Sequence, residues 1–268
     1  MIRLVIVLTL FFIAHPSLSQ STWKLMSTYK SENIISWDVD PMGKVIVAES
    51  GDVLKKLDTS FLIQFSQSSK NFGEISKIDA GHSLKSLVFS ENQQQVGFID
   101  NTLTFQEGIK DLSEEDISYA IDVCYSGQTN RYWVFDADNS RLVLLDNSRP
   151  SNTEINNLAS ITKAPEPTSI FESHNQLIML YEGIGVYVFD YYGTLIRFID
   201  DPKANAIHIS KDYLYFIEEN KMIRLNLRNL NKISLDLPIE NIIDFRVLEQ
   251  YIFFRTSEGI KKYVLNQV

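Results

Sequence analysis

Five polar residues could together perform chemistry in this chain, although they lie far apart in the sequence. They are Asp38, Asp122, His208, Asp244 and Arg246. Carboxylate oxygens bind hard divalent cations such as Ca²⁺, and a bound cation can activate water for hydrolysis. Each of the five occurs in a short apolar segment, as do Asp40, Ser86 and Glu172. Only a fold that gathers these segments around one axis would bring them together. The alternative to a chemical role is a structural one, in which these residues cap turns or bind water in a central channel.

The short motifs of common enzymes are absent from the sequence. It contains no Gly-x-Ser-x-Gly elbow, no His-Glu-x-x-His, no Gly-x-Gly-x-x-Gly and no Walker-type loop. The single cysteine, Cys124, excludes an internal disulfide and a multi-cysteine metal site. We therefore predict no catalytic residue and no cofactor, with an axial divalent cation such as Ca²⁺ as the alternative.

Three aromatic residues are candidates for a ligand or partner surface. Tyr191 and Tyr192 follow Asp190 in a turn that also contains Gly193. A tight hairpin cannot point two consecutive tyrosines inward, so at least one should be exposed, and rigid aromatic anchors dominate many binding surfaces. Trp37, beside Asp38, is the third candidate. Packing between neighbouring units is the alternative role for all three.

An internal repeat decides where these residues lie. An apolar strand, a polar turn, a second strand, another turn and a third strand recur six times, beginning near Ile35, Leu84, Ala120, Pro167, Ala206 and Ile242. Successive starts are about 36 to 49 residues apart, which is the period of a four-stranded propeller blade. We predict an all-β, six-bladed β-propeller, with a β-sandwich or an open β-solenoid as the rival architecture.

The last repeat lacks room for a fourth strand, because only three residues follow Leu265. An extended aromatic segment at residues 21–29 precedes the first repeat. Pairing this segment with the C-terminal blade would close the ring and remove two exposed sheet edges. The outer strand of the third blade is expected within residues 155–161, and one or two helical turns within residues 112–120.

The third repeat carries a motif that resembles the NHL-repeat consensus. Val134-Phe135-Asp136 ends one strand, and Asn139-Ser140-Arg141 leads into the next. The resemblance covers residues 134–146 and implies membership of the broad NHL-like and TolB-like group of six-bladed propellers. That group includes ligand-binding discs, protein-interaction platforms and calcium-dependent lactonases. In this chain we interpret Asp136, Asn139 and Arg141 as turn scaffold.

Composition and the first residues bear on compartment and partner. The formal net charge of −9 disfavours nucleic acid. Arg3, an apolar run at residues 4–14 and small residues at Ser17 and Ser19 are typical of a secretory signal peptide. We expect a signal peptide at residues 1–19, one propeller domain at residues 20–268 and no membrane span after cleavage. A membrane anchor is the alternative for the apolar run.

These observations favour an exported, non-catalytic propeller that binds a protein or serves as a scaffold, in the periplasm or outside a bacterial cell. A protein partner is expected, with a small molecule or glycan as the alternative ligand. Two other functions stay open. One is a metal-dependent hydrolase or lactonase with an axial cation, and the other is a glycan-binding module anchored by Tyr191 and Tyr192.

Overall fold

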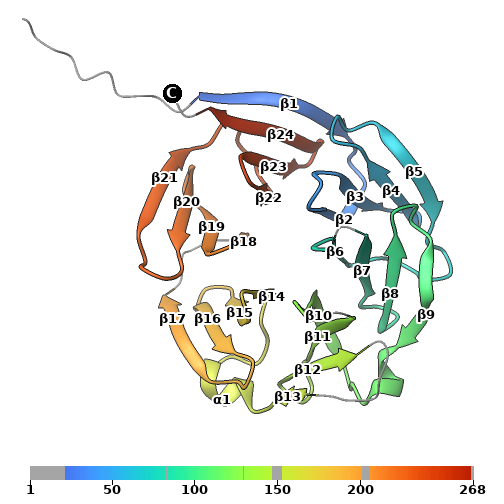
Figure 1. Ribbon diagram of the computed structural model, residues 1–268, viewed down its shortest axis with the longest axis vertical. Coiled ribbons are helices and arrows are strands. Elements are labelled where there is room, and N and C mark those ends of the chain that lie inside the picture. Colours follow the sequence, from blue (N-terminus) through green and yellow to red (C-terminus); the bar gives the residue numbers. More distant parts are fainter. Residues whose placement is uncertain (1–21, 83, 129, 147–152, 201–205, 267–268) are drawn as a thin grey trace, which may run out of the picture.

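The computed structural model describes residues 22–82, 84–128, 130–146, 153–200 and 206–266. Its strands form six four-stranded antiparallel sheets arranged around a central axis (Figure 1). The predicted six-bladed β-propeller is therefore confirmed. Residues 1–19, the predicted signal peptide, lie outside the described part of the chain.

The blades follow one another in chain order. Blade 1 contains β2 (Ile34–Val39), β3 (Val45–Glu49), β4 (Val53–Leu57) and β5 (Ile63–Ser68). Blade 2 contains β6 (Lys77–Asp79), β7 (Lys85–Ser90), β8 (Gln95–Asp100) and β9 (Phe105–Asp111). Blade 3 contains β10 (Ala120–Tyr125), β11 (Arg131–Asp136), β12 (Arg141–Asp146) and β13 (Thr153–Ile155). Blade 4 contains β14 (Ser169–Ser173), β15 (Gln176–Tyr181), β16 (Gly185–Asp190) and β17 (Leu195–Asp200). Blade 5 contains β18 (Ile207–Ser210), β19 (Tyr213–Glu218), β20 (Lys221–Asn226) and β21 (Lys232–Asp236). Blade 6 contains β22 (Asp244–Leu248), β23 (Tyr251–Thr256), β24 (Gly259–Asn266) and β1 (Thr22–Lys30).

The N-terminal strand closes the ring, as the sequence predicted. β1 pairs with β24 from Thr22 opposite Asn266 to Lys30 opposite Gly259, so the first and last strands lie side by side (Figure 1). Gly259 has φ +136°, and a Cβ there would stand 2.0 Å from the carbonyl oxygen of Tyr29. Only glycine allows the two backbones to approach so closely. The closure removes the free edges that the first and last strands would otherwise expose.

Apolar packing lies between blades rather than within them. Each of six buried clusters combines residues from two adjacent blades. In β11, Trp133 and Phe135 face blade 4, whereas Tyr132 and Val134 face blade 2. Successive side chains of a strand point to opposite faces, and here both faces are buried. This is why the middle strands are almost continuously apolar.

Two local expectations were wrong. The first strand of blade 2 is β6, not the segment beginning near Leu84, which is the second strand. β6 has only three residues, two of them charged, so it carries no apolar pattern. In blade 3 the outer strand is β13, and Leu158–Thr162 forms the short helix α1. A 3₁₀ helix occurs at Leu112–Glu115, within the region expected to be helical.

The NHL-like motif forms the predicted turn scaffold. The buried Asp136 carboxylate accepts hydrogen bonds from Asn139 Nδ2 at 2.9 Å, from Arg141 Nε at 3.0 Å and from the backbone N–H of Tyr119 at 3.2 Å. Burial alone would raise the pKa of Asp136, but these donors hold it below its ordinary value. The contacts to Tyr119 also tie the turn to the entrance of β10.

Candidate functional site

Acidic residues on the inner strands join neighbouring blades. Each carboxylate accepts a backbone N–H from the next blade, about one repeat further along the chain. The pairs are Asp38 with Ala80 at 2.7 Å, Asp79 with Tyr125 at 2.9 Å, and Asp122 with Ile170 at 2.8 Å. We call these three contacts the inter-blade staples. They satisfy backbone groups that no strand ladder can reach, because inner strands of different blades do not pair.

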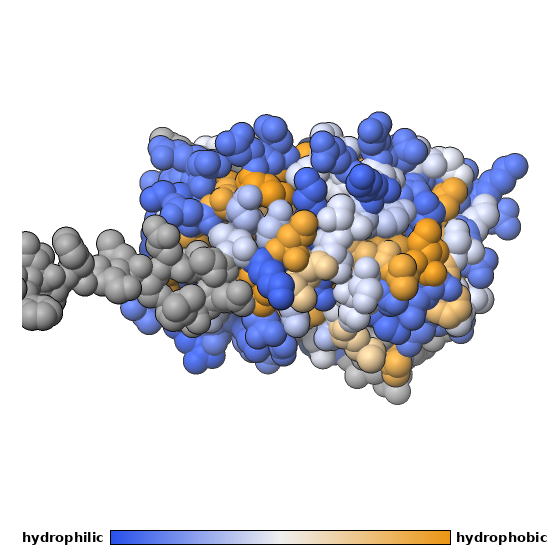
Figure 2. Space-filling model, turned by 90° about the horizontal axis from the view of Figure 1, so that it is seen from above, coloured by the Kyte–Doolittle hydropathy of each residue, from blue (hydrophilic) through white to orange (hydrophobic). Residues whose placement is uncertain are grey.

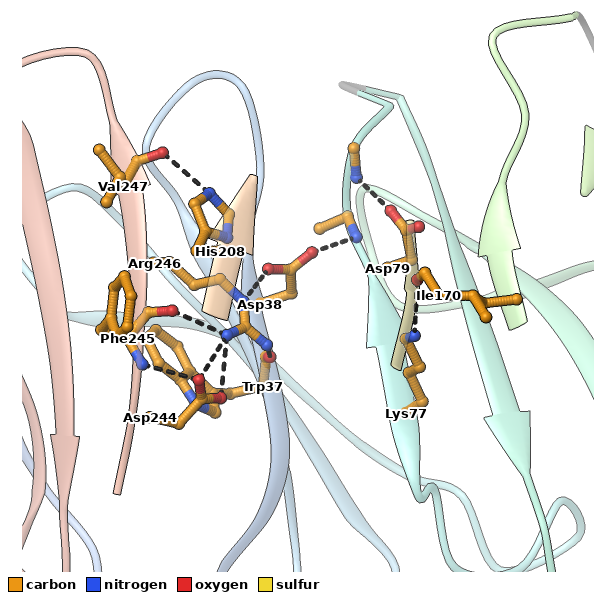
Figure 3. A network of polar contacts seen from close by, with 12 residues as sticks. Trp37, Asp38, Lys77, Asp79, Ile170, His208, Asp244, Phe245, Arg246 and Val247 are labelled. Carbon is orange, nitrogen blue, oxygen red and sulfur yellow. Dashed lines mark hydrogen bonds and ion pairs between the residues drawn. The ribbon is translucent and has the colours of Figure 1, made fainter. Parts of the chain in front are cut away.

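Arg246 organises one side of the channel (Figure 3). Its Nε donates to Asp38 Oδ1 at 2.7 Å, and its Nη1 lies 2.9 Å from both oxygens of Asp244. The guanidinium also donates to the carbonyl oxygens of Phe245 and Trp37 and lies 5.0 Å from the Trp37 ring centroid. Burial would lower the pKa of Arg246, but the two carboxylates raise it above its ordinary value. The arginine is a permanent cation that blades 6 and 1 share.

Lys77 and Asp122 form a second ion pair across the channel from Arg246. Lys77 Nζ lies 2.6 Å from Asp122 Oδ1, and Ile170 N–H donates to the other carboxylate oxygen. Burial is the main cause of the raised pKa of Asp122, and the charge of Lys77 offsets part of this increase. The pKa of Asp79 is also raised, first by burial and then by the charge of Asp38. Lys77 and Asp79 were missed in the sequence because β6 was not recognised.

His208 is a neutral imidazole in this setting. Its Nε2 lies 3.1 Å from the carbonyl oxygen of Val247 in the next blade (Figure 3). A carbonyl oxygen only accepts, so Nε2 carries the proton. Burial, followed by the positive charge of Arg246, lowers the pKa of His208 to about 3. The histidine thus joins blades 5 and 6, as the staples join blades 1 to 4. In the staples a side-chain carboxylate accepts from a backbone N–H, whereas here the side chain donates to a backbone carbonyl oxygen.

The sequence-predicted axial set is therefore gathered in part. Asp38, Asp244, Arg246 and His208 lie together, whereas Asp122 pairs with Lys77 on the other side of the channel. Within the described ranges, no group of three or more His, Cys, Asp or Glu side chains could hold a metal ion. One sequence signal could have revealed the arrangement: Asp38, Asp79 and Asp122 recur at intervals of about one blade.

Of the three other candidates, Asp40 and Glu172 have local roles. Asp40 accepts backbone hydrogen bonds from Met42 and Lys44 and pairs with Lys56 at 3.4 Å. Ser86 lies on β7, the second strand of its blade, away from the inner-strand position expected for it.

Glu172 anchors a turn in blade 4. Its carboxylate accepts hydrogen bonds from Trp133 Nε1 at 2.8 Å, from the backbone of Gly127 at 2.5 Å and from the Tyr191 hydroxyl. Tyr191 also lies against the Trp133 ring, with centroids 6.0 Å apart. Burial and the neighbouring carboxylate raise the pKa of Tyr191. Tyr191 thus belongs to the packing of blades 3 and 4.

The channel has two mouths, with cavities of about 260 and 270 Å³. The first is lined by the ends of the inner strands, including Glu172 and Leu248, and the second by their beginnings, including Ser169 and Asp244. Lys77 and Arg246 line both cavities. Lys77 and Arg246 therefore lie between the two mouths.

The apolar side chains with the highest exposed fraction lie on one face of the disc, the face at which the inner strands end. We call it the strand-end face; it contains the turns between first and second strands and between third and fourth strands. Among the described residues, the four most exposed large apolar side chains all lie on these turns: Tyr192 (92%), Leu62 (68%), Leu84 (64%) and Met42 (60%). One of the two consecutive tyrosines, Tyr192, is thus exposed, in line with the prediction that at least one would be. Trp37 is 2% exposed and lines the second mouth of the channel.

The rim of the disc differs from this face. On the side of β1, hydrophobic residues form small patches separated by hydrophilic ones (Figure 2). Leu25 and Met26 of β1 are about half exposed. None of the helices in the described ranges is long and apolar enough to cross a membrane.

Known proteins resemble this chain in fold only. No family model matches the chain, and no curated protein matches it significantly. Among solved structures, it is similar to a streptogramin B lyase, with TM-score 0.63, 14% identity, and 92% of this chain and 98% of that chain covered. It is also similar to a catalytically inactive virginiamycin B lyase from Staphylococcus aureus with quinupristin, with TM-score 0.61, 13% identity, and 92% and 100% covered.

A third similar structure is BamB from Moraxella catarrhalis, with TM-score 0.53, 9% identity, and 89% of this chain and 85% of that chain covered. The lyase and BamB structures are NHL-like and TolB-like propellers, the group that the repeat motif resembles. Identities this low show the fold alone. The chain is thus a six-bladed β-propeller by its own topology, and its fold is similar to that of these lyases and of BamB.

Proposed function

We propose that this protein is an exported, non-catalytic propeller that binds a protein partner through its strand-end face. One observation carries the proposal: the four most exposed large apolar side chains lie on turns of that single face and come from blades 1, 2 and 4. Exposed apolar anchors on a rigid support are the usual core of a protein interface. A closed ring also orders these turns before binding, which lowers the entropy cost of association.

Export is the part of the proposal that depends on sequence alone. Its support is the pattern of residues 1–19, a basic start followed by an apolar run and small residues. The expected compartment is the periplasm or the exterior of a bacterial cell. Processing would be tested by N-terminal sequencing of the protein recovered from the envelope, with Gln20 expected as the first residue.

The axial groups support a structural role more than a catalytic one. Asp38, Asp79 and Asp122 each accept a backbone hydrogen bond from the next blade. Asp38, Asp122 and Asp244 also pair with Arg246 or Lys77. A divalent cation would have to displace these partners, so we propose that the protein functions without a resident metal. Elemental analysis of the purified protein tests this, and a stoichiometric divalent ion would favour the hydrolase alternative.

The binding proposal is tested by mild cross-linking in the native envelope, followed by mass spectrometry of the attached proteins. The test variant carries Met42→Ser, Leu62→Ser, Leu84→Ser and Tyr192→Ser. The matched control carries Ile184→Ser and Ile243→Ser, exposed apolar residues on the opposite face. We expect the wild type and the control to capture the same partner and the test variant to lose at least about tenfold, or about 1.4 kcal/mol. Undiminished capture by a folded test variant would refute the proposal.

Glycan binding is a second candidate because Tyr192 is 92% exposed and could stack on a sugar ring. Tyr191 is less suited to this role, since its hydroxyl is held by Glu172. Under this alternative, Tyr192→Ala alone would abolish binding to a glycan array. Under the protein-partner proposal, the array would give no signal for either protein.

A further inference from the structure

A cleft between blades 4 and 5 opens at the strand-end face. It has a volume of about 430 Å³. Its walls come from the β14–β15 turn, the β18–β19 turn, the β20–β21 turn and the start of β17. A cleft of this size falls within the range of ligand-binding pockets, which begins at about 300 Å³.

Positive charge gathers in this cleft, although the whole chain has a net charge of −9. Arg197, Lys211 and Arg228 line it, against one carboxylate, Asp212. Asp212 is already engaged by Arg228 at 3.0 Å and by His174 at 3.3 Å. Counting His174 as neutral, the lining carries a formal charge of about +2, and local charge of one sign attracts ligands of the other.

Two of these cations lack a carboxylate partner within the described ranges. Arg197 donates to the carbonyl oxygens of Leu227 and Arg228, the first at 2.6 Å, and it forms no ion pair there. These contacts hold the guanidinium in one orientation, which lowers the entropy cost of binding an anion. Lys211 is exposed and likewise forms no ion pair with a described residue.

Apolar groups complete the cleft and continue beyond it. Val188, Ile196 and Leu227 are the apolar residues of its lining. Leu230, on the same turn as Leu227, is half exposed, and the turn before β17 carries the exposed Tyr192. A ligand with carboxylates alone would leave these flanking apolar groups without a partner, whereas a peptide with acidic and apolar side chains would cover both.

We propose that this cleft binds an acidic peptide segment of the protein partner, with its carboxylates on Arg197 and Lys211. The inference rests on the proposed function and names the chemistry of the segment that the strand-end face selects. Arg197 offers the planar donors that pair with a carboxylate, and Lys211 offers a mobile point charge. Tyr192 and Leu230 then contact apolar residues on either side of the acidic ones.

The test measures binding of two fluorescein-labelled hexapeptides, one with three glutamates and one with three glutamines in their place, to the mature wild type. The variant R197Q/K211Q removes the two cations of the cleft that form no ion pair with a described residue. The control K30Q/K221Q removes two exposed lysines at the other face, so both variants have the same net charge. We expect the glutamate peptide alone to bind, the cleft variant to weaken binding about tenfold, and the control to change it less than about twofold.

Added salt and inorganic phosphate test the peptide-binding assay further. Raising the ionic strength shortens the Debye length from about 10 Å at 0.1 M towards about 3 Å at 1 M, so peptide binding should weaken as salt is added. Inorganic phosphate should compete only at concentrations far above the dissociation constant of the peptide. Tight phosphate binding without peptide binding would overturn the proposal in favour of a small-anion site. Equal peptide binding by both variants would also overturn it.

Partner capture separates this inference from the proposed function. If R197Q/K211Q still captures the partner while the quadruple variant at Met42, Leu62, Leu84 and Tyr192 does not, the face binds a partner but the cleft inference is wrong. If neither variant affects capture yet the cleft variant loses the peptide, the cleft is a peptide site and the proposed function is wrong.

Discussion

Replacing His208 with glutamine should make the protein less sensitive to mild acid. The pKa of His208 is about 3 in the folded protein, because burial and Arg246 disfavour the imidazolium, against 6.5 for an exposed histidine. Between these two pH values, His208 therefore binds a proton in the unfolded chain but not in the folded chain. Stability present above pH 6.5 is lost as the pH falls towards 3. From about pH 7 to about pH 5 the loss from this residue is about 2 kcal/mol.

Glutamine can still donate a hydrogen bond to the Val247 carbonyl and does not titrate. The assay is urea unfolding at about pH 7 and about pH 5, followed by tryptophan fluorescence, for the wild type and His208→Gln. The raised pKa values of Asp79 and Asp122 act in the opposite direction, but both proteins share them, so they cancel in the comparison. His82→Gln, at an exposed histidine, is the matched control. An equal loss of stability in the wild type and His208→Gln would refute the assignment of a neutral imidazole.

Three further perturbations test the ring. Asp122→Ala leaves Lys77 and the Ile170 N–H without their acceptor and should cost about 3 kcal/mol in urea unfolding; the exposed control Asp236→Ala should cost less than about 0.5 kcal/mol. Deleting β1 (Thr22–Lys30) exposes the edge of β24, so the purified variant should elute from a sizing column as soluble aggregates, whereas the elution volume of the wild type would contradict the ring closure. Cys124 is buried and its pKa is raised well above the ordinary value by burial, so a thiol reagent should label it only in denaturant.

The ring could be predicted from sequence because its signals are local and repeated. Six repeats of strand and turn, and an unpaired extended segment at the N-terminus, leave few other ways to satisfy the backbone. Blade 2 was misassigned where the signal fails: β6 is Lys77-Ile78-Asp79, whose charged ends contain no apolar pattern. Its short ladder to β7 is stabilised from outside by the Lys77–Asp122 ion pair and the Asp79 staple.

The roles of the axial residues were harder to predict, because they depend on contacts between blades. Asp38 and Ala80 are 42 residues apart, and Asp38 and Arg246 are 208 apart. Residue type and position on an inner strand cannot distinguish a carboxylate that binds a cation from one that caps a neighbouring backbone group. The two consecutive tyrosines also could not be told apart by residue type and position: Glu172 binds the Tyr191 hydroxyl, whereas Tyr192 is exposed.

The staples explain why we assign binding to the turns rather than to the channel. Removing a buried acceptor leaves a donor without a partner, which costs about 1–3 kcal/mol for each group. A ligand that competed for Asp38 or Asp122 would release Ala80 or Ile170 and an ion-paired cation in the same step. The turns of the strand-end face carry no such cost, because Tyr192, Leu62, Leu84 and Met42 direct largely exposed side chains into solvent. A partner that covers them gains apolar contact without disturbing the ring.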